Sequence, residues 1–273
     1  MFSIFNIPNL LTSMNMLCGI TAILLSVFGR IDLAPFAIFA GAILDFFDGF
    51  VARLLKQQGE LGKQLDSLAD TITFGLAPGI MIMVLLSYSI NIPAVHVFDF
   101  GTTMKMAFND WIESVIAGKP TSFIPFIALL IPFMSMFRLA KFNIDVRQGD
   151  SFIGLNTPAN TIFFTSFPLI LASQFMDVPA LKSVIYTFVN PSIMVPLIIF
   201  MSLLLISEIP FFSFKFKNYK WSGNQLRYAF ILACLILIPT LLAWSIPIVV
   251  FLYILLSIIE NLFLKNKHHE IQS

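Results

Sequence analysis

Long apolar runs recur along the whole chain, and they restrict it to one class of fold. Each run has about the length that an α-helix needs to cross a bilayer, roughly 20 residues. Short polar connections separate the runs, and the mean hydropathy of the chain is +0.90. The sequence therefore predicts an all-α integral membrane protein, a helical bundle of about eight transmembrane helices. The expected spans are about 8–28, 33–55, 65–89, 121–141, 157–176, 187–207, 226–244 and 246–264.

The runs follow one another closely enough to predict a single membrane-embedded domain over 1–273. We expect a catalytic core over about 4–210 and two additional C-terminal spans over about 226–264. Segment 91–120 is too polar to span, and within it apolar residues recur at helical spacing over 103–117. This pattern predicts an amphipathic helix at the membrane surface, with a flexible connector as the alternative. A net charge of +1 without a basic patch gives no reason to expect a nucleic-acid partner.

The distribution of positive charge predicts how the protein sits in the membrane. The connection between spans 33–55 and 65–89 defines one side of the bilayer. Twelve of the sixteen Lys and Arg residues are predicted on that side. The positive-inside rule places that side, and with it both termini, in the cytoplasm. We therefore expect a multi-pass protein of the cell or cytoplasmic membrane whose polar cluster, described next, faces the cytoplasm.

Four carboxylates lie within 26 residues of a chain that is only 11% charged. Asp45 and Asp48 are three apart, and Asp66 and Asp70 are four apart, so each pair shares a helical face. Two consecutive helices joined by a short loop can direct both pairs to one point. Four unpaired carboxylates there would repel one another and lose hydration at high cost. Divalent cations relieve both penalties, and all-oxygen ligation favours Mg²⁺ or Mn²⁺. Metals held in this way typically bind a diphosphate.

The full pattern around these carboxylates, D-x2-D-G-x2-A-R-x8-G-x3-D-x3-D, resembles the signature of the CDP-alcohol phosphatidyltransferases. All eight fixed positions match: Asp45, Asp48, Gly49, Ala52, Arg53, Gly62, Asp66 and Asp70. Weaker likenesses in 7–15, 74–78, 138–143 and 152–158 favour the branch that comprises the CDP-diacylglycerol–serine O-phosphatidyltransferases, the phosphatidylserine synthases. The resemblance extends over about residues 4–170.

The resemblance implies a function and a division of roles. A protein of this branch transfers the phosphatidyl group from CDP-diacylglycerol to L-serine and releases CMP. By resemblance, Asp45, Asp48 and Asp66 are metal ligands, and Asp70 contacts a metal and is the general base. The family also implies two Mg²⁺ or Mn²⁺ ions and a homodimer. The reaction requires these parts, because the diphosphate must be neutralised and one carboxylate must take a proton from the attacking hydroxyl.

The other motif residues have chemical roles that suit a nucleotide-lipid donor. Small side chains at Gly49 and Ala52 let a nucleotide approach the helix backbone, and Gly62 leaves room at the loop. The alternative for small residues is tight helix packing. Arg53 is a candidate phosphate clamp, because its planar guanidinium matches phosphate oxygens; the alternative is a topology charge at a helix end. Lys63 either reaches the same phosphates or faces water.

A second group, Arg138, Lys141 and Asn143, closes span 121–141 on the same membrane side. A cation together with an amide suits the carboxylate and ammonium of serine, so we interpret these residues as the acceptor pocket. Positive-inside anchoring is the alternative for the two cations.

Two other functions fit parts of the pattern. The first is a phosphatidyltransferase that uses glycerol 3-phosphate or inositol phosphate, although those acceptors carry a phosphate and require more basic residues near Asp70. The second is a cation-coupled transporter with the carboxylates as its ion site. Transporter sites usually lie near the bilayer midplane, whereas these carboxylates are predicted close to one membrane face.

Overall fold

The first two helices form an antiparallel pair in the computed structural model, which describes residues 5–90, 99–145, 151–177, 187–212, 221 and 224–272. Helix α1 runs over Ile7–Val27 and α2 over Ala34–Leu54. Asn6 caps α1 by accepting a hydrogen bond from the backbone N–H of Asn9, at 2.9 Å. Gly29 has a φ of 87°, so the turn between the helices uses a backbone conformation that favours glycine.

The next stretch, 60–90, is helical throughout but changes its winding part-way. It consists of α3 (Glu60–Asp70), a π-helical segment η1 (Thr71–Leu76) and α4 (Ala77–Ile90). The π segment begins directly after Asp70. Most of α4 is buried, including Met81, Leu85 and Tyr88, so this helix forms the centre of the bundle.

Helix α5 (Phe100–Ile116) confirms that the polar segment contains an amphipathic helix. Its buried residues include Met104, Ala107 and Trp111, which belong to the same apolar core as α4. The Trp111 indole N–H donates to the Ser122 carbonyl at 2.8 Å and ties the helix to the chain that follows. Its position at a membrane surface stays a prediction.

The described part of the second half of the chain contains five long helices and a short ribbon. Short helix η3 (Ile124–Leu129) leads into α6 (Leu130–Ile144), and α7 (Thr157–Asp177) and α9 (Pro191–Ile206) follow. Helix α10 (Gln225–Leu241), short helix η4 (Leu242–Trp244) and α11 (Ser245–Gln272) complete the fold.

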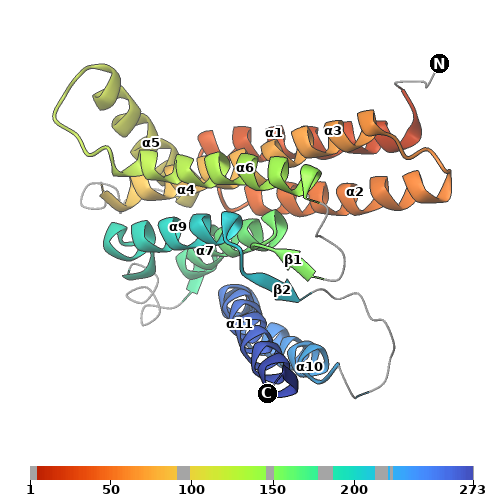
Figure 1. The fold of residues 1–273 in the computed structure, drawn as a ribbon. Helices are drawn as coiled ribbons and strands as arrows, with labels where there is room; N and C mark the ends of the chain where they lie inside the picture. Colours follow the sequence, from red (N-terminus) through yellow and green to blue (C-terminus); the bar gives the residue numbers. More distant parts are fainter. Residues whose placement is uncertain are drawn as a thin grey trace.

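Two three-residue strands were not expected in an all-α protein. Strands β1 (Ser151–Ile153) and β2 (Pro210–Phe212) pair antiparallel, with Phe152 opposite Phe211. The ribbon lies between α7, α9 and the C-terminal helices (Figure 1). Helix α11 supplies hydrogen bonds to its edge: the Tyr253 hydroxyl donates to the Phe212 carbonyl at 3.0 Å, and Ser257 accepts from the Phe212 N–H at 3.4 Å. These bonds pair backbone polar groups of the ribbon that would otherwise be buried without partners.

Five described helical stretches are long and apolar enough to cross a membrane. They are Ile7–Val27, Ala34–Leu54, Glu60–Ile90, Ile124–Ile144 and Gln225–Asn261, with Pro191–Ile206 as a shorter apolar helix. The chain is therefore a multi-pass helical membrane protein, as predicted, while the number of eight spans stays a prediction. Figure 1 shows the start of α1, the end of α2 and the start of α3 at the same end of the bundle.

Candidate active site

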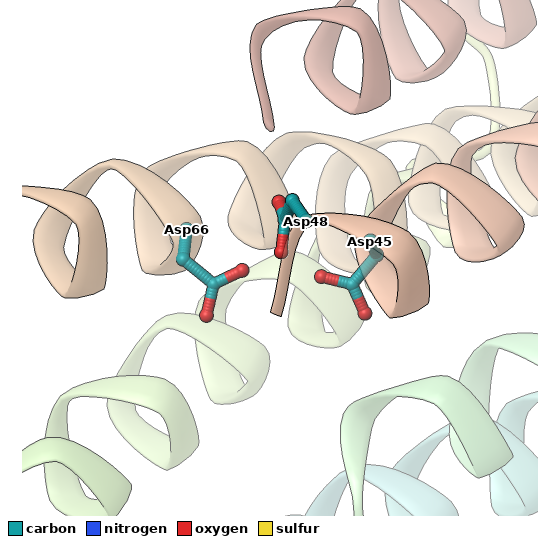
Figure 2. Close-up of side chains that lie close together, drawn as sticks. All are labelled: Asp45, Asp48 and Asp66. Atoms are coloured by element: carbon teal, nitrogen blue, oxygen red, sulfur yellow. The ribbon is translucent and has the colours of Figure 1, made fainter. Parts of the chain in front are cut away.

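Three carboxylates from two helices meet at this end of the bundle. Asp45 and Asp48 project from α2, and Asp66 projects from α3 (Figure 2). One carboxylate oxygen of each lies within 4.8 Å of the others. Asp48 is buried, and Asp45 and Asp66 are partly buried. The predicted convergence of the two pairs is confirmed for these three residues.

The fourth carboxylate has a different environment. Asp70 lies one turn beyond Asp66, at the end of α3, and is buried with 9% of its surface exposed. It interacts with the Asp45 side chain, and its Oδ1 accepts a hydrogen bond from the Asn15 amide at 3.2 Å. Asp70 is thus next to the cluster of three and held by a separate neutral donor.

Helix α1 contributes to the site although it carries no charged side chain. Its Thr12 hydroxyl donates to Asp48 Oδ2 at 2.5 Å, and its Asn15 amide donates to Asp70. Both side chains are buried. Hydrogen bonds from neutral donors favour the ionised carboxylates without cancelling their charge.

A cleft of about 510 Å³ opens beside the carboxylates and is lined by α1, α2, α3 and the α2–α3 connection. Its lining includes the motif residues Gly49, Ala52, Arg53 and Gly62, and also Lys63. Asp48 and Asp66 also line it, together with Pro8, Asn9, Thr12, Gln57, Gln58, Gly59 and Glu60. The eight-position motif thus forms one wall of a single cavity, except for Asp45 and Asp70, which lie beside it.

The small motif residues leave space where the sequence analysis expected a ligand to approach. A Cβ atom built at Gly49 meets no atom within 4 Å, so tight helix packing does not explain this glycine. At Gly62 the nearest atom is Asn9 Oδ1, at 3.4 Å from the built Cβ. By contrast, a Cβ at Gly79 would lie 2.7 Å from Pro132, so tight helix packing accounts for the glycine at that position.

Lys63 and Asn143 connect α3 to the end of α6. The Lys63 ammonium donates to the Asn143 carbonyl at 2.7 Å, and the Asn143 amide donates to the Ser67 hydroxyl at 2.7 Å. These bonds were not foreseen from the sequence, because the partners lie about 80 residues apart. They hold the end of α6 against the carboxylate-bearing helix.

The three residues expected to form an acceptor pocket have different partners. Arg138 is buried, and its Nε donates to the Leu155 carbonyl at 3.3 Å. Its guanidinium also interacts electrostatically with the Asp70 carboxylate. Lys141 is half-exposed and forms an ion pair with Glu208. Asn143 bonds to α3 as described. Of the three, only Arg138 combines a buried charge with an electrostatic interaction with Asp70. The pocket itself stays a prediction.

Sequence reasoning gave no chemical role to the polar face of α1. Asn9, Thr12 and Asn15 are spaced by three and are all buried. A buried polar stripe on an otherwise apolar helix was the available signal, because such groups are costly in a membrane unless they have partners.

Comparison with known proteins identifies the family to which this chain belongs. The model of the family described as CDP-alcohol phosphatidyltransferase matches residues 5–189. The chain belongs to the CDP-alcohol phosphatidyltransferase family. The matched region includes all four carboxylates and the cleft, and it ends before α10 and α11.

The chain is similar to several named proteins. A CDP-diacylglycerol–serine O-phosphatidyltransferase of Bacillus subtilis is 33% identical over 171 residues, which is 61% of this chain and 80% of that protein. A protein of the same name from Helicobacter pylori is 28% identical over 265 residues, 95% of this chain and 92% of the relative. An archaetidylserine synthase of Methanothermobacter thermautotrophicus is 28% identical over 172 residues, 61% of this chain and 59% of that protein.

The donor set fits the divalent metal that CDP-alcohol phosphatidyltransferases use. Asp45, Asp48 and Asp66 offer only oxygen ligands, close enough together to bind the same ion. Hard carboxylate oxygens suit Mg²⁺ and Mn²⁺ rather than softer metals.

Proposed function

We propose that this protein transfers the phosphatidyl group of CDP-diacylglycerol to L-serine, giving phosphatidylserine and CMP. The observation that carries the proposal is the convergence of Asp45, Asp48 and Asp66 beside a cleft lined by the rest of the family motif. The names of the Bacillus and Helicobacter relatives support serine as the acceptor.

In this proposal each part of the site has one task. Gly49 and Ala52 leave room for the cytidine diphosphate along α2, and Arg53 and Lys63 provide positive charge at the cleft for phosphate oxygens. Asp45, Asp48 and Asp66 hold one or two Mg²⁺ or Mn²⁺ ions, with Asp70 contacting the metal site. When bound, the ions supply charge neutralisation at the diphosphate and stabilisation of CMP as leaving group.

Asp70 is the proposed general base. It takes the proton of the serine hydroxyl as the serine oxygen forms a bond to the phosphorus atom that carries diacylglycerol. The bond between that phosphorus and the oxygen bridging to CMP breaks, and CMP leaves with the electron pair. Burial beside other carboxylates, with hydrogen-bond support from Asn15, is a suitable environment for a proton acceptor.

The arrangement of cations favours serine over a phosphorylated acceptor. Lys141 forms an ion pair with Glu208, and Arg53 and Lys63 are assigned to the phosphates of the donor. Arg138 is a buried cation that interacts electrostatically with Asp70. One guanidinium suits the single carboxylate of serine, whereas glycerol 3-phosphate and inositol phosphate carry a dianionic group that several cations would recognise better.

We further propose that the cleft and both termini face the cytoplasm, where the water-soluble acceptor is available, and that the protein is a homodimer. The orientation rests on the loop charges. This orientation is tested by measuring whether cysteines in the loops react with a thiol reagent from the outside or the inside of sealed vesicles.

The decisive experiment is acceptor screening with purified protein in detergent. CDP-diacylglycerol and Mg²⁺ or Mn²⁺ are supplied with serine, glycerol 3-phosphate or inositol phosphate, and CMP and the lipid product are measured. We expect serine-dependent CMP release that stops when the metal is chelated and returns when it is restored. Turnover with glycerol 3-phosphate but not serine would refute the acceptor assignment. Absence of CMP release with every acceptor would refute the enzymatic function.

A further inference from the structure

A buried amide on α1 contacts the proposed general base. Asn15 has no exposed surface, and its Nδ2 donates to Asp70 Oδ1 at 3.2 Å. A carboxylate only accepts hydrogen bonds, so this contact requires the nitrogen of the amide, and not its oxygen, to face Asp70. The two residues are 55 positions apart and belong to different helices.

The same amide has an unpaired oxygen. Among the described residues, no group donates a hydrogen bond to Asn15 Oδ1, although this atom is buried. Leaving such an acceptor unpaired costs about 1–3 kcal/mol. A leucine, which has the same number of side-chain heavy atoms, would avoid this cost in the interior of an apolar bundle. Packing alone therefore does not account for asparagine at this position.

The surroundings of Asn15 restrict how the amide can lie. Thr73, three residues after Asp70, donates its hydroxyl to the Asn15 backbone carbonyl at 2.9 Å. A Cβ atom at Gly41 would lie 2.7 Å from Thr73 Cγ2 and 2.9 Å from Asn15 Oδ1. A Cβ at Gly19 would lie 2.5 Å from the Thr73 hydroxyl. The two glycines thus let α1, α2 and the π segment approach closely around the amide.

The helix that carries Asp70 changes its winding at this point. The π-helical segment begins at Thr71, and Thr73 lies within it. Short π segments are uncommon and are frequently found at functional sites. The hydrogen bond from Thr73 to α1 fixes this segment directly behind the carboxylate.

We propose that Asn15 is a positioning residue for Asp70, with Thr73 fixing Asn15 relative to the helix that carries the carboxylate. The Asn15 amide holds one oxygen of Asp70, and this contact sets the direction in which the other oxygen meets the acceptor hydroxyl. The inference rests on the proposed function, because it gives Asn15 a role only if Asp70 accepts the proton.

Substitutions that remove the polar atoms but retain the branching of the side chain separate this role from packing. Asn15→Leu removes the amide and its unpaired oxygen, and Thr73→Val removes the hydroxyl, while Thr73→Ser retains it. Loss of a residue that orients a functional group typically costs about 10- to 100-fold in activity. We expect Asn15→Leu to lower kcat by about that factor, with both KM values and the Mn²⁺ affinity, measured by calorimetry, changed by less than about threefold. Thr73→Val should lower kcat to a smaller extent, and Thr73→Ser should restore it.

The glycines supply a matched control. Gly41→Ala forces a Cβ toward Asn15, whereas Gly79→Ala forces one to 2.7 Å from Pro132, away from the carboxylates. If the two variants lower the melting temperature by similar amounts, we expect kcat per folded protein to fall in Gly41→Ala and to be retained in Gly79→Ala.

The outcomes distinguish this proposal from the proposed function. Wild-type protein without turnover on any acceptor refutes the function, and the inference with it. Active wild-type protein with unchanged kcat in Asn15→Leu refutes the positioning role alone. A loss of Mn²⁺ binding or of thermal stability in parallel with kcat also refutes it, because Asn15 would then act on the metal cluster or on the fold. If the wild type prefers another acceptor, the same comparison is made with that acceptor.

Discussion

Replacement of Arg138 by alanine tests the least constrained part of the site, the acceptor pocket. Arg138 is 5% exposed, its Nε donates to the Leu155 carbonyl, and its guanidinium lies 4.8 Å from the centre of the Phe142 ring. The hydrogen bond and the ring contact hold the guanidinium group in place. The groups that interact electrostatically with it include Asp70. Among the described residues the Leu155 carbonyl is the hydrogen-bond partner of this guanidinium, and we expect the serine carboxylate at its other N–H groups.

The magnitude follows from the bond that would be lost. A hydrogen bond to a charged partner contributes about 1.5–3 kcal/mol, which corresponds to about 10- to 150-fold in affinity. We expect Arg138→Ala to raise the KM for serine by this factor and to leave the KM for CDP-diacylglycerol within about threefold. The substitution also removes the donor to the Leu155 carbonyl, so some loss of stability is expected, of about 1–3 kcal/mol.

Steady-state kinetics that vary each substrate in turn measure the effect, with gel filtration to select folded protein. Lys141→Ala is the matched control, because it removes a cation three residues away that already pairs with Glu208. A half-exposed ion pair contributes at most about 1 kcal/mol, and the KM for serine should change by less than about threefold. Equal increases in both KM values for Arg138→Ala would refute the assignment and move Arg138 to the donor phosphates. A large effect of Lys141→Ala on serine alone would show that the Glu208 pair opens during the reaction.

Three further predictions concern the carboxylates and the donor cleft. Asp45→Ala, Asp48→Ala and Asp66→Ala should each abolish turnover in protein that still inserts into membranes, because each supplies a ligand that the cluster cannot replace; normal CMP release at saturating metal would contradict this. Asp70→Asn should lower kcat by about 10²–10⁴-fold, with binding of CDP-diacylglycerol largely retained. If the affinity for CDP-diacylglycerol is lost together with kcat, Asp70 is chiefly a metal ligand. Gly49→Leu fills open space beside the cleft, so the KM for CDP-diacylglycerol should rise at unchanged melting temperature, and an unchanged KM would exclude Gly49 from the donor site.

Much of the helical framework was predictable because membrane-spanning helices have a strong local signal. Expected spans 8–28 and 33–55 correspond to α1 over Ile7–Val27 and α2 over Ala34–Leu54. Helix α3 begins at Glu60, earlier than the expected span, because polar residues next to a membrane face can continue a helix without contributing to hydropathy. Convergence of Asp45, Asp48 and Asp66 was predictable for a related reason, since it follows from helical spacing and a short connection.

The features that could not be predicted depend on partners far apart in the sequence. Three-residue strands such as Pro210–Phe212 are too short to produce a periodic pattern, and they form because β1, β2 and α11 meet in space. The engagement of Lys63 by the Asn143 carbonyl likewise depends on the contact between α3 and α6. Local patterns predicted which side chains are polar and on which helical face they lie, but not which polar group each one bonds.

The polar stripe of α1 resolves a physical difficulty of the site. Asp48 and Asp70 are both buried, and like charges at close range would favour separation of the helices that carry them. A cationic partner would relieve this repulsion, but it would also compete with the metal for the carboxylates. Thr12 and Asn15 instead donate neutral hydrogen bonds, one to each helix. These bonds connect α1 to α2 and α3 on either side of the cluster and leave its negative charge in place. Removal of either bond should therefore affect the site before it affects the bundle, whose apolar packing around α4 does not depend on these two side chains.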